Sequence, residues 1–294
     1  MKRLTGFLLG LSVALGGVGL AAAQEKSEHM GPPKVLTVFR EVLKPGKAGM
    51  VHEKSESAFV QAFTKAKWPT HYLAVTSLSG KPRALFFVGY DSFAALEKDN
   101  QATEKNAALS AALDRASMAD GELLSEAEGL TLVYRPDQSL RADSLQIAHM
   151  RYFDITVFHV KPGHEKDWDE AVKLVTPAYE KMPEAHWATF EAAYGAPSGT
   201  YAIFTPMKSL DEVDKAYARD KDFMAAMGEA GMKRLSELSA AAIASSESNL
   251  FQFAPKMSYV SDDWVKADPD FWKPKAAMPA GEKKAEKKPA AKKQ

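Results

Sequence analysis

Two stretches of the chain, 34–46 and 150–163, share a run of apolar and β-branched residues that ends in Lys-Pro-Gly. About eight residues rich in Val, Ile, Phe, Thr and Tyr are typical of a β-strand. Proline cannot donate to a strand ladder and glycine accepts positive φ, so the tripeptide ends the strand and turns the chain. The two tripeptides lie 117 residues apart, and this spacing predicts an internal repeat.

The first repeat is predicted to span 34–137. Segments in which apolar or small residues recur at helical spacing alternate with strand-like segments. The predicted elements are a strand at 35–43, a helix at 48–67, strands at 71–78 and 84–90, an alanine-rich helix from the N-cap Ser92 to about 127, and a strand at 130–134. The order βαββαβ is that of a ferredoxin-like unit.

The second repeat is predicted to span 148–256, with the same order of elements. They are a strand at 150–160, a helix at 164–181, strands at 188–194 and 200–204, a helix capped by Ser209 that runs to about 245, and a strand at 250–254. Ser92 and Ser209 lie 117 residues apart, and Pro136 and Pro255 lie 119 apart. These constant offsets indicate a duplication.

The strands predict how the repeats meet. Phe153, Ile155 and Val157 alternate with Phe158 and Val160, so the strand is apolar on both faces and should be buried on both. Each sheet carries its helices on one face and leaves the other bare. We therefore expect an α+β fold in which two ferredoxin-like repeats pack sheet to sheet as an intramolecular α/β barrel.

The strand, the Lys-Pro-Gly turn, the amphipathic helix, the central hairpin and the late alanine-rich helix resemble the dimeric α/β-barrel superfamily. The similarity is to NIPSNAP-like and antibiotic-biosynthesis-monooxygenase-like domains, here in tandem over about 220 of 294 residues. The resemblance implies a barrel with a cavity between the sheets. It does not select an activity, because the superfamily includes cofactor-free monooxygenases, haem proteins similar to chlorite dismutase, and members with no known reaction.

The chain ends carry different signals. Residues 1–23 have a basic start, a short apolar run and Ala21-Ala22-Ala23, which predicts a signal peptide cleaved near Ala23 and a periplasmic or secreted protein. An uncleaved anchor is the alternative; no later segment is long and apolar enough to span a membrane. The aromatic-rich extension 257–274 should pack back onto the fold, and the Lys/Ala/Pro tail 275–294 is predicted to be disordered.

Composition narrows the classes of function. The chain has no cysteine, so disulfides, lipid anchoring and thiol chemistry are excluded. Its net charge of zero combines +2 in 1–23, +5 in 275–294 and −7 between them. An acidic body argues against nucleic-acid binding, whereas the basic tail could touch anionic envelope components. Duplication makes a monomer plausible, and a homodimer stays open.

Polar residues on strands expected to be buried are the candidate site, because burial without a partner is costly. On the first strand these are Arg40 and Glu41. Histidine is the usual base near neutral pH. The ligand-binding candidates are Arg40, His71, Asp154, His159, His186 and Glu191. An open barrel should expose Arg40 or His159 to a pocket, and a filled one should be occupied by Phe, Leu and Trp.

No metal site is predicted. His52-Glu53-Lys54 and His164-Glu165-Lys166 look alike, but they are five residues out of register when the Lys-Pro-Gly turns are aligned, and neither has a second ligand at the spacing of His-Glu-x-x-His. No cofactor is expected, with haem as the alternative; His159, His164 and His186 are its candidate ligands in the second repeat.

Three functions stay open. The first is an exported protein that binds a small, largely apolar molecule between its sheets. The second is a cofactor-independent or haem-dependent oxidoreductase that uses the same cavity. The third is a non-catalytic envelope interaction protein with a filled barrel. The sequence does not decide whether the protein is an enzyme.

Overall fold

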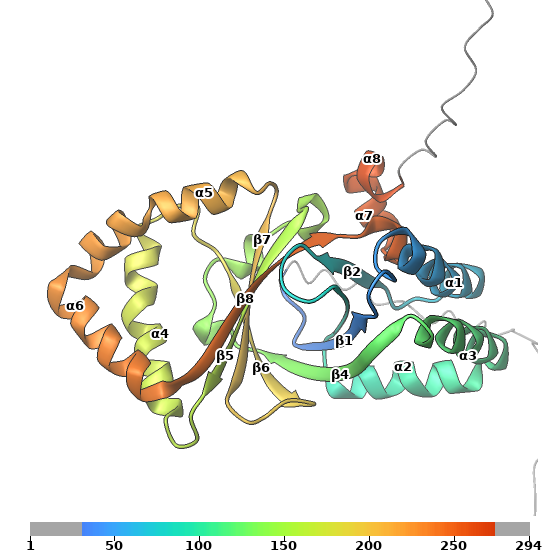
Figure 1. Cartoon of the computed structure of the whole chain (residues 1–294), viewed down its shortest axis with the longest axis horizontal. Helices are drawn as coiled ribbons and strands as arrows, with labels where there is room; N and C mark the ends of the chain where they lie inside the picture. Colours follow the sequence, from blue (N-terminus) through green and yellow to red (C-terminus); the bar gives the residue numbers. More distant parts are fainter. Residues whose placement is uncertain (1–30, 274–294) are drawn as a thin grey trace, which may run out of the picture.

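The computed structural model describes residues 31–273 (Figure 1). The predicted signal peptide, 1–23, and the tail, 275–294, lie outside these residues. The first repeat contains β1 (Val35–Leu43), α1 (Met50–Ala66), β2 (Tyr72–Ser77), β3 (Arg83–Tyr90), α2 (Phe93–Lys105), α3 (Ala107–Gly121) and β4 (Leu124–Tyr134). The second contains β5 (Tyr152–Val160), α4 (Glu165–Glu180), β6 (Ala188–Tyr194), β7 (Thr200–Met207), α5 (Asp211–Ala218), α6 (Asp220–Ala242) and β8 (Ile243–Phe253). None of the helices in 31–273 combines the length and apolarity that a membrane crossing needs.

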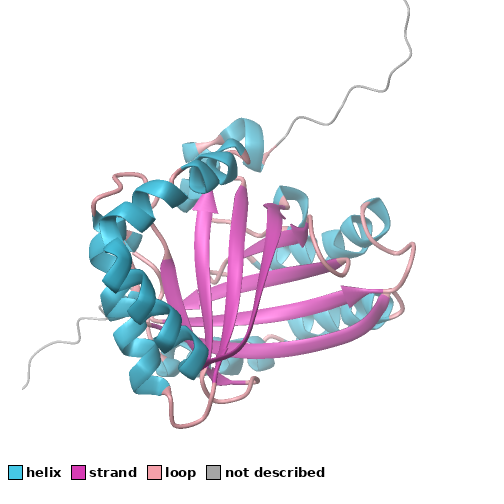
Figure 2. Cartoon of the chain, turned by 60° about the vertical axis from the view of Figure 1, so that its left-hand side comes forward, coloured by secondary structure: helices cyan, strands magenta, loops and turns pink. Residues whose placement is uncertain are grey.

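The strands form one closed barrel in the order β1-β3-β2-β8-β5-β7-β6-β4. Within each repeat the order is that of a ferredoxin-like sheet, and the two sheets join edge to edge where β2 pairs with β8 and β4 with β6. The helices of the two repeats lie on opposite outer sides of the strands (Figures 1 and 2). The predicted α/β barrel of two repeats is therefore confirmed, and pairing at both seams leaves neither sheet with a free edge.

Alternation along the strands separates the barrel interior from the helix layers. Leu36 and Val38 of β1 and Phe153 and Ile155 of β5 point inward and are buried. The neighbouring Phe158 points outward and packs on Trp168 of α4. The interior is thus an apolar core shared by both repeats.

The last strand of each repeat is longer than predicted. β4 begins at Leu124 and β8 at Ile243, where the sequence pattern predicts helix to about 127 and 245. Residues at the start of these strands are small or polar and have little β-propensity. Pairing with β1 and β5 overrides that local preference, and Ser125 Oγ donates to the carbonyl of Val42 at 3.1 Å.

The alanine-rich helices are also broken: α2 and α3 replace the first, and α5 and α6, with a kink at Gly228 inside α6, replace the second. Asn106 ends α2 and caps α3, its side chain accepting from the N–H of Leu109 at 3.1 Å. Ser92 caps α2 as predicted, accepting from the N–H of Ala95. Ser209 does not cap its helix: Leu210 takes the N-cap position of α5, with no side-chain hydrogen bond. Ser209 thus lies 117 residues after Ser92, at the start of the equivalent helix, but it does not repeat the capping hydrogen bond.

A segment follows the last strand of each repeat and covers the same end of the barrel. After β4 come η1 (Pro136–Gln138), η2 (Ala142–Ser144) and η3 (Ile147–His149); after β8 come η4 (Pro255–Met257), α7 (Asp262–Ala267) and α8 (Pro269–Trp272). Leu140 pairs with Trp187 before β6, and Tyr259 pairs with Tyr72 at the start of β2. The extension packs back onto the barrel as expected, but it is helical.

Gly195→Ala should weaken the seam between β4 and β6. Gly195 has φ +84°, and a Cβ there would lie 2.2 Å from the carbonyl oxygen of Gly129 on β4. Gly163 also has positive φ, but nothing lies within 4 Å of its Cβ position. We expect Gly163→Ala to cost about 1–2 kcal/mol for the backbone conformation alone, and Gly195→Ala about 1–3 kcal/mol more for overpacking. Urea unfolding of both variants measures the difference; equal losses would contradict it.

Candidate functional site

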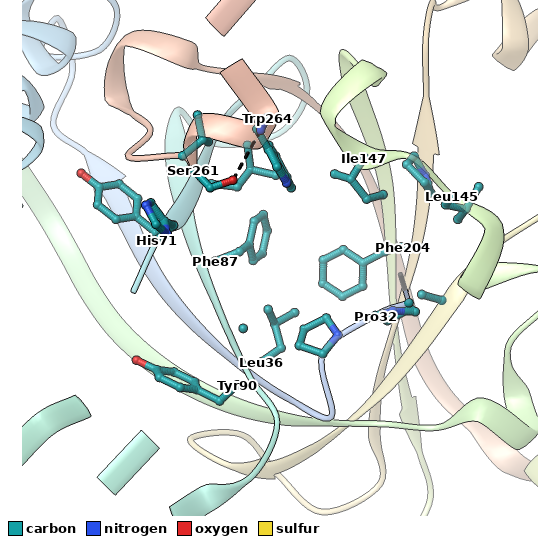
Figure 3. Close-up of a pocket in the computed structure, with 18 of the residues that line it drawn as sticks. Pro32, Leu36, His71, Phe87, Tyr90, Leu145, Ile147, Phe204, Ser261 and Trp264 are labelled. Atoms are coloured by element: carbon teal, nitrogen blue, oxygen red, sulfur yellow. Dashed lines mark hydrogen bonds between the residues drawn. The ribbon is translucent and has the colours of Figure 1, made fainter. Parts of the chain in front are cut away.

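A cavity of about 600 Å³ opens at the end of the barrel where β1 and β5 begin. Inward-facing side chains from both repeats form its walls and floor, chiefly Leu36, Leu73, Phe87, Phe153, Phe190 and Phe204. Figure 3 places Phe87 and Phe204 at its centre, with His71 to one side and Trp264 above. Large inward-facing aromatic side chains fill the middle of the barrel, and the cavity lies between them and the mouth.

The two segments after β4 and β8 cover this mouth. Leu145 and Ile147 line the cavity from the first segment, and Val260 and Trp264 line it from the second. The second segment is joined to the first by the indole N–H of Trp272, which donates to the carbonyl of Ala148 in η3 at 2.8 Å. An ion pair between Arg151 and Asp268 adds to this attachment. The cover therefore depends on contacts between residues far apart in the chain.

Polar groups gather on one side of the cavity wall. Thr70, His71, Tyr90 and Asp91 line it there. Asp99 of α2 accepts hydrogen bonds from the hydroxyls of Thr70 at 2.6 Å and Tyr90 at 3.0 Å. It also accepts from the indole N–H of Trp68 at 3.1 Å. This carboxylate holds two wall residues in place without itself lining the cavity.

His71 is the histidine in the cavity wall. Its ring stacks on Tyr259 with centroids 4.8 Å apart. Burial lowers the pKa of His71 below its ordinary value of 6.5, against the opposing charge of Asp262. The imidazole is therefore neutral near neutral pH. In that form one ring nitrogen can accept a proton or hydrogen bond and the other can donate one.

Charged side chains lie across the opposite end of the barrel. Arg40 pairs with Glu128, and Arg83 pairs with Glu247 at 3.3 Å while its guanidinium sits 5.3 Å from the ring centre of Phe251. None of these four charged residues lines the cavity, which lies at the other mouth.

The six sequence-predicted residues are dispersed, and His71 is the one that lines the cavity. Arg40 and His159 share the inward face of their strands but lie at the far end; His159 Nδ1 is 3.0 Å from the hydroxyl of Thr200. Asp154 alternates with inward Phe153 and so faces the helix layer, where burial raises the pKa of its carboxyl. A ligand-binding role for these three stays a prediction.

His186 and Glu191 lie outside the cavity as well. Both ring nitrogens of His186 are 2.7 Å from backbone carbonyl oxygens, those of Glu184 and Pro206. Glu191 accepts from Arg135 at 2.6 Å. Their ligand-binding roles also stay predictions.

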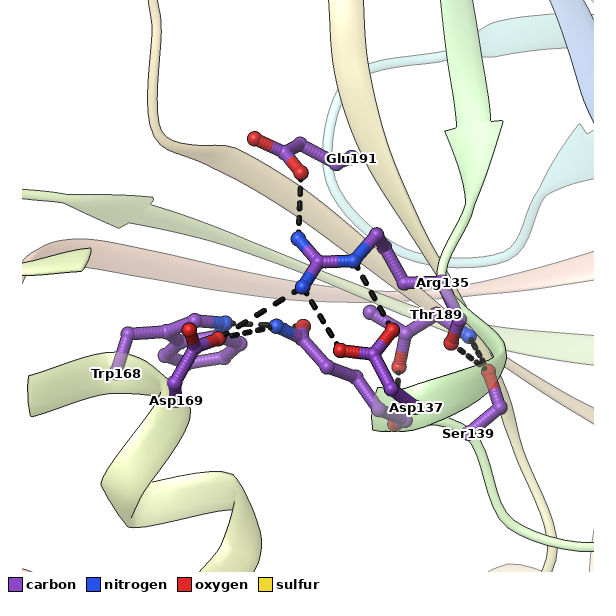
Figure 4. A network of polar contacts seen from close by, with 8 residues as sticks. Arg135, Asp137, Ser139, Trp168, Asp169, Thr189 and Glu191 are labelled. Carbon is purple, nitrogen blue, oxygen red and sulfur yellow. Dashed lines mark hydrogen bonds and ion pairs between the residues drawn. The ribbon is translucent and has the colours of Figure 1, made fainter. Parts of the chain in front are cut away.

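Glu191 belongs to a polar network between the segment after β4 and the second repeat (Figure 4). Arg135 bridges Glu191 and Asp137, and these carboxylates raise the pKa of its guanidinium. Gln138 donates to Asp169 at 2.7 Å and accepts from the indole N–H of Trp168 at 3.1 Å. The polar groups of this network bond to one another, which favours a structural role: the network attaches the segment after β4 to the second repeat.

A haem ligand is not offered by the three histidines proposed for it. His159, His164 and His186 lie outside the cavity, and His164 Nδ1 is 2.7 Å from the carboxylate of Asp167. The cavity histidine, His71, is stacked face to face on Tyr259. His71 is therefore the histidine of the cavity wall, and none of the three histidines predicted as haem ligands lies there.

Sequence reasoning missed most of the cavity wall. Phe87 and Phe204 read as ordinary core residues, and Trp264 as part of a packed extension. Thr70 and Tyr90 stand at strand ends with no motif around them. These residues come together only because the segments after β4 and β8 pack over the mouth of the barrel, and no local sequence pattern predicts that packing.

No protein-family model matches the chain, and no curated protein matches it. Among solved structures, a protein of Fusobacterium nucleatum subsp. nucleatum, provisionally named a monooxygenase, is 14% identical, covering 76% of this chain and 93% of its own, with a TM-score of 0.49. An anthrone oxidase-like protein is 18% identical (75% and 92%, TM-score 0.46). A variant of the chlorite dismutase of Candidatus Nitrospira defluvii is 8% identical (81% and 97%, TM-score 0.44).

These are the kinds of protein that the sequence resemblance named. At such low identities and TM-scores the likenesses carry no inference about activity. The assignment of the fold rests on the strand order of the chain itself, two ferredoxin-like units closed into one barrel.

Proposed function

We propose that this protein binds a small, largely apolar molecule in the cavity at the covered mouth of the barrel. The observation that carries the proposal is the cavity itself: about 600 Å³, walled by aromatic and aliphatic side chains, with a few polar groups on one side. Ligand sites of proteins have this size and this composition.

The arrangement of the wall suggests how such a molecule would lie. Its apolar body would contact Phe87, Phe153 and Phe204, and a polar group would face His71 and Thr70. Asp99 holds Thr70 and Tyr90 before any ligand arrives, so little side-chain freedom would be lost on binding. A molecule with one polar end fits this wall best.

Filling the cavity should weaken binding of an apolar probe. Ala188 of β6 is buried and lines the cavity, and Ala192 lies on the same face of the strand without lining it. We expect Ala188→Phe to weaken binding of N-phenyl-1-naphthylamine by about tenfold or more, a loss of about 1.4 kcal/mol. Ala192→Phe should leave the affinity nearly unchanged. Fluorescence titration of both variants, with thermal unfolding to verify folding, checks this; equal affinities would place the probe elsewhere.

A second candidate is a cofactor-independent oxidoreductase, which the neutral imidazole of His71 in the cavity wall favours. His71 would accept a proton from an acidic C–H or O–H of the bound molecule, and dioxygen would oxidise the resulting anion: one oxygen atom would replace two hydrogens of the substrate as a new C=O, and the other would leave as water. Oxygen consumption with a panel of apolar phenols and 1,3-diketones tests this. Turnover that His71→Gln abolishes while probe binding persists would support an enzyme; no consumption with any compound would leave binding as the function.

We further propose that the chain is exported and cleaved near Ala23, which N-terminal sequencing of the protein from its host would test. The basic residues of 275–294 are the proposed contact with anionic envelope components. A barrel completed by one chain needs no partner to close it, so we propose a monomer over a homodimer.

A further inference from the structure

Four ionisable side chains meet in the helix layer of the first repeat, on the far side of the sheet from the barrel interior. Glu41 comes from β1, His52 and Glu56 from α1, and Asp120 from the end of α3. Their exposed fractions are 4%, 2%, 3% and 1%. Three carboxyl groups and an imidazole are thus buried together, where a hydrophobic core is normally found.

Their ligand atoms converge on one point. His52 Nε2 lies 2.8 Å from Glu41 Oε2, 3.7 Å from Glu56 Oε1 and 3.6 Å from Asp120 Oδ1. One ligand atom from each of the four residues lies within 4.8 Å of all the others. His52 and Glu56 are four residues apart and so share a helix face, while the strand and the second helix supply the rest.

Hydrogen bonds within the protein do not satisfy this group. Glu56 Oε1 and both carboxylate oxygens of Asp120 are buried and have no hydrogen-bond partner. An unpaired buried carboxylate costs several kcal/mol. Two of them, Glu56 Oε1 and Asp120 Oδ1, lie near the imidazole nitrogen that already contacts Glu41, so they face a place that a further positive group would occupy.

The helix layer of the second repeat is apolar at the place that the four ionisable side chains occupy in the first. The β5 residue 117 positions after Glu41 is Phe158. Trp168 and Val172 form the pair four residues apart on α4, and all three belong to one apolar cluster with the buried Ala242 of α6. The helix layer of the second repeat is therefore filled by apolar side chains, whereas the first repeat buries four ionisable side chains in its own.

We propose that Glu41, His52, Glu56 and Asp120 form a binding site for one divalent transition-metal ion such as Zn²⁺, Mn²⁺ or Fe²⁺. Three oxygen donors and one imidazole nitrogen suit these ions. Mg²⁺ and Ca²⁺ prefer oxygen ligands alone, so the histidine selects against them. The ion would take the place of the proton shared by His52 and Glu41 and would neutralise most of the charge of the carboxylates.

The site is independent of the proposed ligand cavity. Phe86 packs against His52 with ring centroids 6.5 Å apart and belongs to the aromatic cluster between the sheet and α1. None of the four ligands lines the cavity. Loss of metal and loss of probe binding are therefore separate outcomes, and the ion would enter as the repeat folds or as α1 and α3 separate.

The test uses the untagged mature protein, unfolded in chelator and refolded with Zn²⁺, Mn²⁺ or Mg²⁺. We expect one equivalent of Zn²⁺ or Mn²⁺ per chain by inductively coupled plasma mass spectrometry. With free ion about 100-fold above Kd, the thermal unfolding midpoint should rise by about 5–10 °C. Mg²⁺ should give neither effect. Less than a tenth of an equivalent, or no thermal shift with either transition metal, would overturn the proposal.

Matched variants separate ligation from folding. Asp120→Asn and Glu56→Gln keep the shape of the side chain and replace a carboxyl ligand by an amide, so each should lose the bound metal and the thermal shift while remaining about as stable as the parent chain in chelator. Glu53→Gln, next to His52 but paired with Lys256 at the surface, should retain both. Variants at Asp120 and Glu56 that still bind one equivalent with the same shift would contradict the site.

Discussion

Replacing Phe204 by alanine should lower the free energy of unfolding by about 3–5 kcal/mol, the range for large aromatic residues removed from a core. Phe204 is 6% exposed, and its ring packs edge-on against Phe87, Phe153 and Phe190 at 5.5–5.7 Å. These partners come from both repeats, so the cavity left behind cannot collapse without moving both sheets. Urea denaturation followed by tryptophan fluorescence measures the loss.

The matched control is Phe93→Ala. Phe93 is 44% exposed at the start of α2 and has one aromatic neighbour, Tyr194. Its removal should cost about 1 kcal/mol or less. Phe204 also lines the ligand cavity, so the variant should admit larger apolar probes if it is refolded at low temperature. Similar losses for the two variants would mean that the aromatic cluster does not hold the barrel together.

Replacing His52 by alanine should destabilise the chelator-treated protein by about 3–5 kcal/mol at neutral pH, because it removes the cationic partner of three buried carboxyl groups. At a surface site, water hydrates a charge that loses its partner. Here the three carboxyl groups are only 1–4% exposed, so hydration cannot replace the lost imidazole. Chemical denaturation in the presence of EDTA gives the value free of any contribution from metal.

His164→Ala is the control, because His164 also lies at the N-terminal end of the first helix of its repeat and also pairs with a carboxylate. It pairs with Asp167 at 2.7 Å, but the two side chains are 42% and 37% exposed. A surface pair contributes about 1 kcal/mol or less. If the two alanine variants lost the same stability, the cluster around His52 would have to be hydrated.

The elements with strong local signals were predictable. The Ser-Gly-Lys-Pro turn and its flanking apolar runs predict β2 and β3, and the Lys-Pro-Gly turns predict where β1 and β5 end. The first halves of β4 and β8 were not predictable. Their Ser, Glu and Ala residues are compatible with a helix, and only pairing with β1 and β5 makes them strands.

The candidate sites were harder to predict from the sequence than the fold was. Alternation identifies Arg40 and His159 as inward-facing, but which mouth stays open depends on the packing of residues near 145 and 264. Glu41 stands out as a carboxylate on a buried strand. Its partner Asp120 is 79 residues away and lies at the end of an alanine-rich helix, and no spacing rule connects the two.

Closure of the barrel within a single chain has a consequence for symmetry. In a barrel made of two identical subunits, every substitution occurs twice, and a ligand on the two-fold axis has two equivalent orientations. Here His71 and His186 occupy matching places before β2 and β6, yet one faces the cavity and the other is held between two carbonyl groups. The two halves of this barrel therefore differ, so that a molecule bound in the cavity would meet an environment without two-fold symmetry and adopt one orientation.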